Sequence, residues 1–443
     1  MGEPRRVVVT GVGAVTPLGM DVPSMWSGLL SGRSAIGRIQ AFDSTGFPVQ
    51  IAAEVPAREI EAHFRLPKLR KYADRKVLMA VRSAEEALAH AGFGPEGLDP
   101  EGHGTRRNMP DPERFGVSVG TESGRPLLEE VARTYYGYRD HLAAGGTALD
   151  RLRQVDPLDF VSTTPHLTST LLAITVGAQG PNFTCSTACT SSAQALGEAA
   201  LAIRRGQADV MLAGGTDALV EAFMVTGFAL LGALSARNDE PERASRPFDR
   251  DRDGFVLGEG AGFMVLEALD HALERGAPIL GELVGYGCSS NAYRITDSPP
   301  DGRGAFQSMR WAIQDAGLTP SHIGYVNAHG TSTQMNDASE TAGIKLALGE
   351  HAARCPVSST KSVMGHLVAS CGVVESIICL MTIREGVIPP TMNYDNPDPL
   401  CDLDYVPNVA RAAHVDYAMT NSFGFGGSNG SLIFGRYTGK GAA

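Results

Sequence analysis

Short apolar runs alternate with longer amphipathic segments along most of the chain. The apolar runs, bounded by glycine or polar turns, predict strands at Val7–Thr10, Phe115–Val119, Val210–Ala213, Gly262–Leu266, Leu280–Val284, Ile323–Asn327, Pro356–Ser359 and Tyr417–Asn421. Helical periodicity predicts helices at Arg75–Ala91, Ser191–Arg205, Gly304–Ala316, Asp337–Leu348 and Glu375–Arg384. Strands that alternate with helices of this length indicate an α/β protein, with helices on both faces of buried parallel sheets.

A weak internal repeat relates two parts of the chain. The stretch that ends at Cys189 passes through small residues into a predicted helix, and the stretch that ends at His366 does the same. His271–Pro278 ends another helix between them. We therefore predict two duplicated halves, residues 1–272 and 273–443, each with one chemically active side chain at a turn before a helix.

Two segments look like insertions. Pro95–Arg114 is rich in glycine and proline and has no periodicity, which predicts an exposed loop. Val131–Leu152 is predicted to be helical and is rich in arginine and tyrosine.

Composition excludes several classes of protein. The net charge of -11 provides no general attraction for nucleic acid, and no apolar stretch is long enough to span a membrane. The cysteines are odd in number and lie mostly among apolar or small residues, which favours reduced thiols and a cytoplasmic location. They are Cys185, Cys189, Cys288, Cys355, Cys371, Cys379 and Cys401.

Three ligand-binding motifs fail on spacing. After Gly11 and Gly13, a dinucleotide fingerprint needs a third glycine where the chain has Thr16. The acidic run that starts at Asp249 resembles a calcium loop, but its twelfth position is Gly260 rather than glutamate. No cysteine and histidine spacing fits a zinc site, so no metal is predicted.

Four other motifs together indicate one type of reaction. Cys189 precedes an alanine-rich helix, whose positive N-terminal end should favour the thiolate. His329 follows an apolar strand, and Lys361 and His366 precede another helix. Asn421–Gly430 is a glycine-dense loop whose backbone N–H groups could approach a ligand. Taken singly, Cys189 could be a core residue and His329 a structural one. Together, the motifs suit acyl transfer through a thioester.

These motifs, in this order, resemble the beta-ketoacyl-[acyl carrier protein] synthases of the thiolase superfamily, closest to the synthase II type. The resemblance covers nearly the whole chain and includes Val9–Gly19, Ser245–Asp249, Asp251–Gly262 and Cys401–Pro407. It implies a five-layered α-β-α-β-α fold with two duplicated halves. It also implies the decarboxylative condensation of an acyl chain with malonyl carrier protein, without a cofactor.

The resemblance assigns roles at the reacting centre. It implies that Cys189 is the nucleophile, and that His329 and His366 bind the malonyl thioester and promote decarboxylation as neutral Nε2 donors. The backbone N–H groups of Cys189 and Phe425 match the oxyanion hole, and the Phe425 ring matches a gate. Lys361 matches a family lysine.

Further positions support this centre. The carboxylates expected beside Lys361 are Asp337 and Glu340. A weaker correspondence relates three residues to a monovalent-cation position in some members. These are Asn327, Glu375 and Asn421.

The resemblance also implies an acyl tunnel and a docking surface. Acyl carrier protein is acidic, and its expected contacts are Lys68, Arg70 and Lys71. The tunnel is expected to contain Glu122 and Phe228. The carboxylate of Glu122 and the glycine at Gly232, where members usually carry arginine, depart from the family pattern.

Those departures leave the pathway open between fatty acid and type II polyketide or polyene elongation. The partner is correspondingly a second copy of the chain or a chain-length-factor homologue. Two other functions compete: a thiolase acting on CoA esters, which needs a second cysteine in the last glycine-rich loop, and a non-catalytic chain-length factor, which lacks the nucleophile.

Overall fold

The computed structural model describes residues 5–56, 60–93, 109–122, 128–147, 149–150 and 164–439. In this part of the chain, the main sheet has the strand order β10-β9-β13-β14-β8-β1-β7-β6-β4-β5. The strands are β1 Val7–Val15, β4 Phe115–Gly120, β5 Asn182–Cys185, β6 Val210–Asp217, β7 Gly260–Ala268, β8 Gly281–Ser290, β9 Tyr325–Asn327, β10 Val357–Ser358, β13 Tyr417–Phe423 and β14 Ser428–Gly435. Two small pairs lie outside it, β2 Ile36–Arg38 with β3 Ile51–Ala53, and β11 Val387–Ile388 with β12 Arg411–Ala412.

The main sheet consists of two five-stranded groups with the same internal order. If the five strands of a group are numbered along the chain, both groups have the spatial order 3-2-4-5-1. This order is β5-β4-β6-β7-β1 in the first group and β10-β9-β13-β14-β8 in the second. In both groups the second, third and fourth strands are parallel and the fifth is antiparallel to the fourth and the first. The groups join where Val8 and Val9 pair with Glu282 and Gly281. The expectation of parallel sheets therefore holds for the second to fourth strands of each group and is wrong at the fifth, because buried strands carry similar apolar runs whatever their direction.

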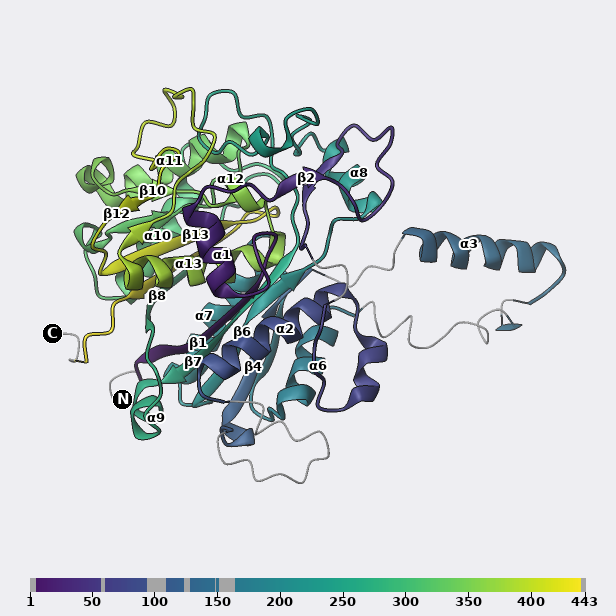
Figure 1. Cartoon of the computed structure of the whole chain (residues 1–443), viewed down its shortest axis with the longest axis horizontal. Helices are drawn as coiled ribbons and strands as arrows, with labels where there is room; N and C mark the ends of the chain where they lie inside the picture. The colour runs from purple at the N-terminus through teal and green to yellow at the C-terminus, as the bar shows by residue number, and fades with distance from the viewer. Residues whose placement is uncertain are drawn as a thin grey trace.

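Helices complete five layers (Figure 1). The central helices α7 (Ser191–Arg204) and α13 (Cys371–Glu385) pack on each other and on strands of both groups. The first group is covered on its outer face by α2 (Arg75–His90) and α6 (Leu167–Val176). The second is covered by α10 (Arg303–Asp315), against which α11 (Gln334–Leu348) packs. This is the α-β-α-β-α arrangement that the resemblance implies.

Glycines allow the same close contact in both halves. A Cβ atom on Gly13 of β1 would lie 2.0 Å from the carbonyl oxygen of Ser83 in α2, and one on Gly287 of β8 would lie 2.0 Å from that of Ser308 in α10. A second glycine two residues earlier on each strand faces the next turn of the same helix. The glycines that resemble a dinucleotide fingerprint thus serve helix–strand packing.

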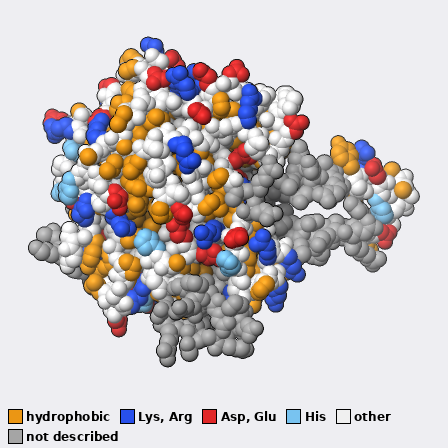
Figure 2. All heavy atoms as spheres, viewed as in Figure 1, with side chains coloured by type: hydrophobic (Ala, Val, Ile, Leu, Met, Phe, Trp, Pro, Cys, Tyr) orange, Lys and Arg blue, Asp and Glu red, His pale blue; other side chains and the backbone are white. Residues whose placement is uncertain are grey.

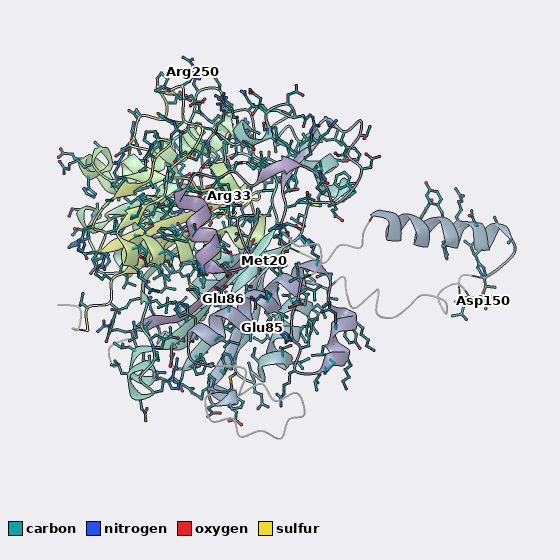
Figure 3. All side chains as sticks on the ribbon, viewed as in Figure 1. Met20, Arg33, Glu85, Glu86, Asp150 and Arg250 are labelled. Carbon is teal, nitrogen blue, oxygen red and sulfur yellow. The ribbon has the colours of Figure 1, made fainter. Side chains whose placement is uncertain are left out.

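Side-chain oxygens tie α2 to the start of the chain. Asp74 caps the helix by accepting a hydrogen bond from the Val77 N–H at 3.0 Å. Glu86, labelled in Figure 3, accepts from the N–H groups of Ala14 and Val22, each at 2.9 Å. These bonds fix β1 and the helix α1 (Val22–Leu30) against α2.

The two predicted insertions differ. Val131–Leu152 overlaps the helix α3 (Leu128–Ala143), which stands away from the body, with Asp150 beyond its end (Figures 1 and 3). Tyr135 and Tyr136 on α3 are exposed. Residues 95–108, 148 and 151–152 lie outside the described residues, and the remainder of Pro95–Arg114 includes a short 3-10 helix, Pro112–Arg114.

The other helices are short. They are α8 Ala222–Leu230, α9 Leu269–Glu274 and α12 Lys361–Met364, with 3-10 helices at Pro67–Tyr72, Pro241–Arg243, Pro320–His322, Gly349–Ala353 and Val368–Ser370. On the face shown in Figure 2, acidic and basic side chains are intermingled. In the described part of the chain, each helix is too short or too polar to cross a membrane.

Candidate active site

Cys189 lies on a strained turn between β5 and α7. Ala188, directly before it, has a φ of 52°, which a residue with a side chain rarely adopts. The Ser191 hydroxyl braces the turn, since its oxygen accepts from the Thr187 N–H at 2.9 Å and donates to the Ala188 carbonyl at 2.7 Å. The turn presents the Cys189 thiol just before the helix begins.

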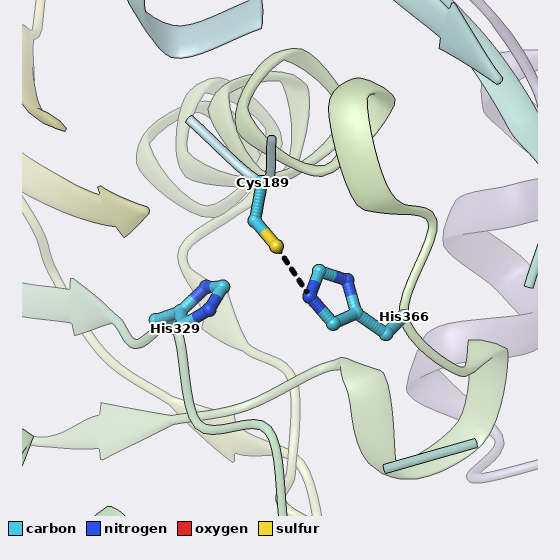
Figure 4. A group of neighbouring side chains, drawn as sticks. All are labelled: Cys189, His329 and His366. Carbon is cyan, nitrogen blue, oxygen red and sulfur yellow. Dashed lines mark hydrogen bonds between the residues drawn. The ribbon is translucent and has the colours of Figure 1, made fainter. Parts of the chain in front are cut away.

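The C-terminal half places two imidazoles opposite this thiol (Figure 4). His329 comes two residues after β9, and His366 follows β10 and α12. The His366 Nε2 atom lies 3.1 Å from the Cys189 Sγ atom, and the two imidazole rings are 5.3 Å apart, edge to face. The three predicted side chains therefore share one centre, although their catalytic roles stay a prediction here.

The backbone selects the tautomer of His366. The N–H of Val368 donates to the His366 Nδ1 atom at 3.2 Å, so Nδ1 is the acceptor and the proton of the neutral ring is on Nε2. The sulfur of Cys371 lies 3.1 Å from the same Nδ1 atom. His366 is thus arranged to donate from Nε2 toward Cys189 and the space around it.

Both imidazoles are neutral at neutral pH. Burial, and after it the positive charge of Lys361, holds the pKa of His329 and the pKa of His366 well below the ordinary range. The Nδ1 atom of His329 is buried without a hydrogen-bond partner among the described residues. The N–H groups of His329 and Gly330 donate to the Glu340 carboxylate at 2.9 and 2.7 Å, which fixes the turn that carries the ring.

The expected thiolate is wrong for the resting site. Burial raises the pKa of the Cys189 thiol to about 12, although the charge of Lys361 and the N–H groups of Phe425 and Cys189 lower it. A helix N-terminus contributes about 0.3–1 kcal/mol, less than tenfold in an ionisation constant. Burial of the thiol, which the sequence motif does not reveal, raises its pKa by more than the helix N-terminus lowers it.

The expectation for Lys361 holds only in part, because the charge of Glu340 acts on it but Glu375 forms the ion pair. Its ammonium group pairs with Glu375 of α13, and both side chains are fully buried. Burial is the largest single effect and disfavours the ammonium, but the charge and hydrogen bond of Glu375, together with Cys371 and Glu340, raise the pKa of Lys361 overall. Asp337 instead accepts from the N–H of Phe248 at 2.8 Å and lies 3.7 Å from Arg252.

Glu340 therefore holds the His329 turn, and Asp337 belongs to a separate buried cluster. The monovalent-cation position stays a prediction. The side chain of Asn327 and the Oε2 atom of Glu375 are buried without partners in the described part of the protein, which fits a bound cation. Asn421 donates to Glu340 at 3.3 Å.

The predicted glycine-dense loop is the turn of a hairpin between β13 and β14. A Cβ atom on Gly424 would lie 2.9 Å from the Thr187 carbonyl oxygen, so glycine lets this turn approach the nucleophile. The N–H groups of Cys189 and Phe425 both lie beside the sulfur, where they lower its pKa. This placement suits a pair of oxyanion donors.

A cavity of about 580 Å³ opens onto the three side chains. Its apolar lining comes mainly from α8 and residues next to it, including Leu219, Phe223, Met224, Phe228 and Leu231. Its polar lining includes Asp253, Thr296, Asp297, Thr331, Thr333 and Asn336. The cavity therefore offers contacts both to an apolar chain and to a polar linker.

Both predicted tunnel residues line this cavity. The Phe228 ring is 5.5 Å from Phe255 and 6.3 Å from Phe425. The Glu122 carboxylate accepts from the Ala188 N–H at 2.9 Å. The sequence also allows Glu122 to point away from the tunnel and to pair with Arg125 or another arginine, and Arg125 lies outside the described residues.

The predicted docking residues Lys68, Arg70 and Lys71 are exposed on the 3-10 helix Pro67–Tyr72. None of them lines the cavity. Their contact with a carrier protein stays a prediction.

Sequence reasoning missed two contacts of His366. Phe255 packs edge to face on its ring at 5.1 Å, and Cys371 faces its Nδ1 atom. A cysteine five residues after a candidate catalytic histidine is a signal that could have been noticed. Within the described residues, Cys189, His329 and His366 have donor atoms within 4.8 Å of one another. Zinc could bind this donor set only after deprotonating a thiol whose pKa is about 12.

Comparisons with known proteins show the family of this chain. Residues 4–272 match the family described as "Beta-ketoacyl synthase, N-terminal domain", and residues 280–395 match "Beta-ketoacyl synthase, C-terminal domain". The chain therefore belongs to the beta-ketoacyl synthase family, as its motifs indicate.

Full-length relatives carry one name. A 3-oxoacyl-[acyl-carrier-protein] synthase 2 from a Synechocystis species is 43% identical over 98% of this chain and 99% of its own. One from Staphylococcus aureus is 39% identical over 99% of this chain and 100% of its own.

Solved structures share the fold. A beta-ketoacyl synthase from Burkholderia phymatum has a TM-score of 0.85 at 35% identity, covering 98% of this chain and 100% of that one. A type II polyketide ketosynthase, bound to its acyl carrier protein and a hexaketide, has a TM-score of 0.83 at 34% identity with the same coverage. The ishigamide ketosynthase/chain length factor has a TM-score of 0.84 at 34% identity, again covering 98% and 100%.

Proposed function

We propose that this chain condenses an acyl group on Cys189 with malonyl carrier protein, releasing carbon dioxide and forming 3-oxoacyl carrier protein. The observation that carries the proposal is the contact of 3.1 Å between the Nε2 atom of a neutral His366 and the Cys189 sulfur. Full-length relatives that are named 3-oxoacyl-[acyl-carrier-protein] synthase 2 support the reaction class.

In the first half-reaction, the Cys189 sulfur attacks the thioester carbonyl of an acyl carrier protein. The N–H groups of Cys189 and Phe425 stabilise the oxyanion. The carrier thiolate leaves and takes up the proton that Cys189 has lost. Because the resting pKa of Cys189 is about 12, this proton loss must occur during acylation rather than beforehand.

In the second half-reaction, malonyl carrier protein enters the cavity with its thioester oxygen toward His329 and His366. Carbon dioxide leaves, and the electron pair of the broken bond forms an enolate. Two neutral N–H donors stabilise that negative charge without transferring a proton. The enolate carbon attacks the acyl thioester, and the released sulfur of Cys189 takes up a proton.

The two competing functions have less support. The turn between β13 and β14 carries Phe425 where a thiolase would need its second cysteine. A chain-length factor would lack the nucleophile, whereas here Cys189 lies beside two neutral imidazoles.

We propose two protein partners. An acyl carrier protein would dock on the surface of Lys68, Arg70 and Lys71, as charge complementarity favours. A second subunit would pair along β5, the last strand in the sheet order, whose Phe183 is 37% exposed. That subunit is a second copy or a chain-length-factor homologue. The cysteines are all free thiols, which supports the predicted cytoplasmic location.

For the acyl chain, the carboxylate at the cavity wall favours an oxidised or unsaturated chain of a polyketide or polyene pathway over a saturated one. Burying an unpaired charge against hydrocarbon is costly. The structural likeness to two ketosynthases from such pathways supports this choice.

The test is a condensation assay with purified chain, alone and mixed with the candidate second subunit. Malonyl carrier protein is offered with either a saturated or a polyunsaturated acyl carrier protein, and mass spectrometry detects the 3-oxoacyl product. We expect faster turnover of the unsaturated chain. If the protein alone elongates the saturated acyl group at full rate, the proposed pathway is contradicted. If neither acyl group gives a product, the proposed reaction is contradicted.

A further inference from the structure

Glu122 occupies a position in the first half that corresponds to His329 in the second. Glu122 comes two residues after β4, and His329 comes two residues after β9. β4 and β9 are each the second strand of their group and lie between the third and fourth. The duplicated fold therefore directs both side chains to the same cavity, and both line it.

The Glu122 carboxylate contacts the nucleophile's turn. Its Oε1 atom accepts from the Ala188 N–H at 2.9 Å and from the Ser186 hydroxyl at 3.4 Å. Ala188 is the residue with a φ of 52° directly before Cys189. A left-handed residue with a side chain persists only where its surroundings hold it, and this acceptor contacts its N–H.

Glu122 is itself held in place. Its N–H donates to the Asp217 Oδ1 atom at 3.2 Å, and Asp217 Oδ2 accepts from the Ala369 N–H at 2.9 Å. Ala369 lies three residues after His366. One bonded path thus connects the turn of the nucleophile with the turn of the histidine that contacts it.

We propose that Glu122 is a positioning residue whose carboxylate holds the left-handed Ala188 turn and so presents Cys189 to the cavity. The negative charge of Glu122 also disfavours a negative charge on the Cys189 sulfur, and this contributes to the raised pKa of Cys189. This role concerns the reactivity of the thiol and does not depend on the proposed condensation.

Other charged groups act on the same centre and must stay constant in a test. Asp217, at the end of β6, has a pKa raised to about 7 by burial, and Lys76 of α2 partly opposes that effect. The titratable groups near Cys189 also include Lys361, His329, His366 and Cys371.

The experiment compares Glu122→Gln, which keeps an acceptor but loses the charge, with Glu122→Ala, which loses both. Two rates are measured: alkylation of Cys189 by iodoacetamide across pH, read by mass spectrometry of its peptide, and acylation of Cys189 by an acyl-CoA. Glu54→Gln is the matched control, because the Glu54 carboxylate also accepts from backbone N–H groups, at Gln40 and Ala41, but does not line the cavity.

We expect Glu122→Gln to be alkylated about threefold to tenfold faster than the unaltered chain below the thiol pKa, because a nearby negative charge is gone. Acylation of Glu122→Gln should be faster than that of Glu122→Ala, because the glutamine carbonyl can still accept from the Ala188 N–H. Glu122→Ala should lose about tenfold or more in acylation, because the Ala188 N–H has lost its acceptor. If Glu122→Gln retains acylation and Glu122→Ala loses it, the loss results from the missing hydrogen-bond acceptor and not from a general loss of folding.

An alkylation profile of Glu122→Gln that matches the unaltered chain, or full-rate acylation by Glu122→Ala, would overturn the proposal. Both readouts are stoichiometric and need no malonyl carrier protein. Failure of the condensation assay would therefore leave this test intact, and the reverse also holds.

Discussion

The two halves of the chain share one scaffold and supply different chemistry. Each has the same order and directions of five strands, and each packs a glycine-bearing first strand directly on an outer helix. After the second strand, the first half has Glu122 and the second has His329. After the third strand, the first half has Cys189 and the second has His366. The backbone arrangement is the same in both halves, whereas the side chains at equivalent positions differ.

The electrostatics of the halves differ accordingly. In the first half, burial and Glu122 keep Cys189 protonated. In the second, burial and the charge of Lys361 keep both imidazoles neutral. A protonated nucleophile beside neutral donors has no stable ion pair to break before substrate binds. We therefore propose that the first half carries acyl transfer and the second carries decarboxylation, so substitutions should separate the two half-reactions.

The largest expected effect is that of Cys189→Ala. Formation of acyl-enzyme should fall at least about a thousandfold, because among the described residues Cys189 is the only thiol that lines the cavity. Release of labelled carbon dioxide from malonyl carrier protein should persist, because both imidazoles remain. Intact-protein mass spectrometry and counting of carbon dioxide measure the two outcomes. Loss of both acylation and decarboxylation in a folded variant would contradict the assignment of the two half-reactions to different halves of the chain.

His329→Ala and His366→Ala should show the converse. Each removes one donor to the enolate and should slow decarboxylation by about a hundredfold to a thousandfold. Acylation of Cys189 should survive in part. His414→Ala, at an exposed histidine, is the control. Equal losses of acylation and decarboxylation would mean that the histidines serve both half-reactions without distinction.

The pH dependence should separate the halves without mutation. Alkylation of Cys189 should rise about tenfold for each pH unit between about 7 and 10, because the pKa of the thiol is about 12. Decarboxylation should stay flat down to about pH 6.5, because a lowered histidine pKa keeps the neutral donor dominant above it. An alkylation plateau near pH 7 would indicate a resting thiolate instead.

A smaller effect tests the shared scaffold. Gly13→Ala and Gly287→Ala each place a Cβ atom 2.0 Å from a helix carbonyl oxygen, and each should destabilise the fold by about 1–3 kcal/mol. Gly37→Ala is the control, because nothing lies within 4 Å of its added Cβ atom. Thermal unfolding measures all three. If only one of the first two lowers the melting temperature, the contacts are not equivalent.

Much of the scaffold could be predicted, because eight buried strands and five long helices show clear periodicity. β5 was missed because only Asn182–Cys185 form it. β14 was missed because the glycines of Ser428–Gly435 and of the turn before it indicate a loop, yet they let the hairpin approach Cys189. Strand direction could not be predicted from buried runs that look alike either way.

The convergence of Cys189, His329 and His366 and the neutral state of both imidazoles were predicted, but the protonated thiol and the ion-pair partner of Lys361 were not. Motif order located Cys189, His329 and His366. The partner of Lys361 is Glu375, 14 residues later on a central helix, and only the packing of α13 brings them together. The pKa of Cys189 depends on depth of burial, which the sequence around it does not encode.

The most direct test of the central claim is to locate the acyl group. The unaltered chain is incubated with an acyl carrier protein alone and digested, and its cysteine peptides are analysed by mass spectrometry. The account predicts acylation of Cys189 alone, although Cys288 is exposed and Cys185 is partly so. An acyl group on either of those residues, with Cys189 unmodified, would contradict it.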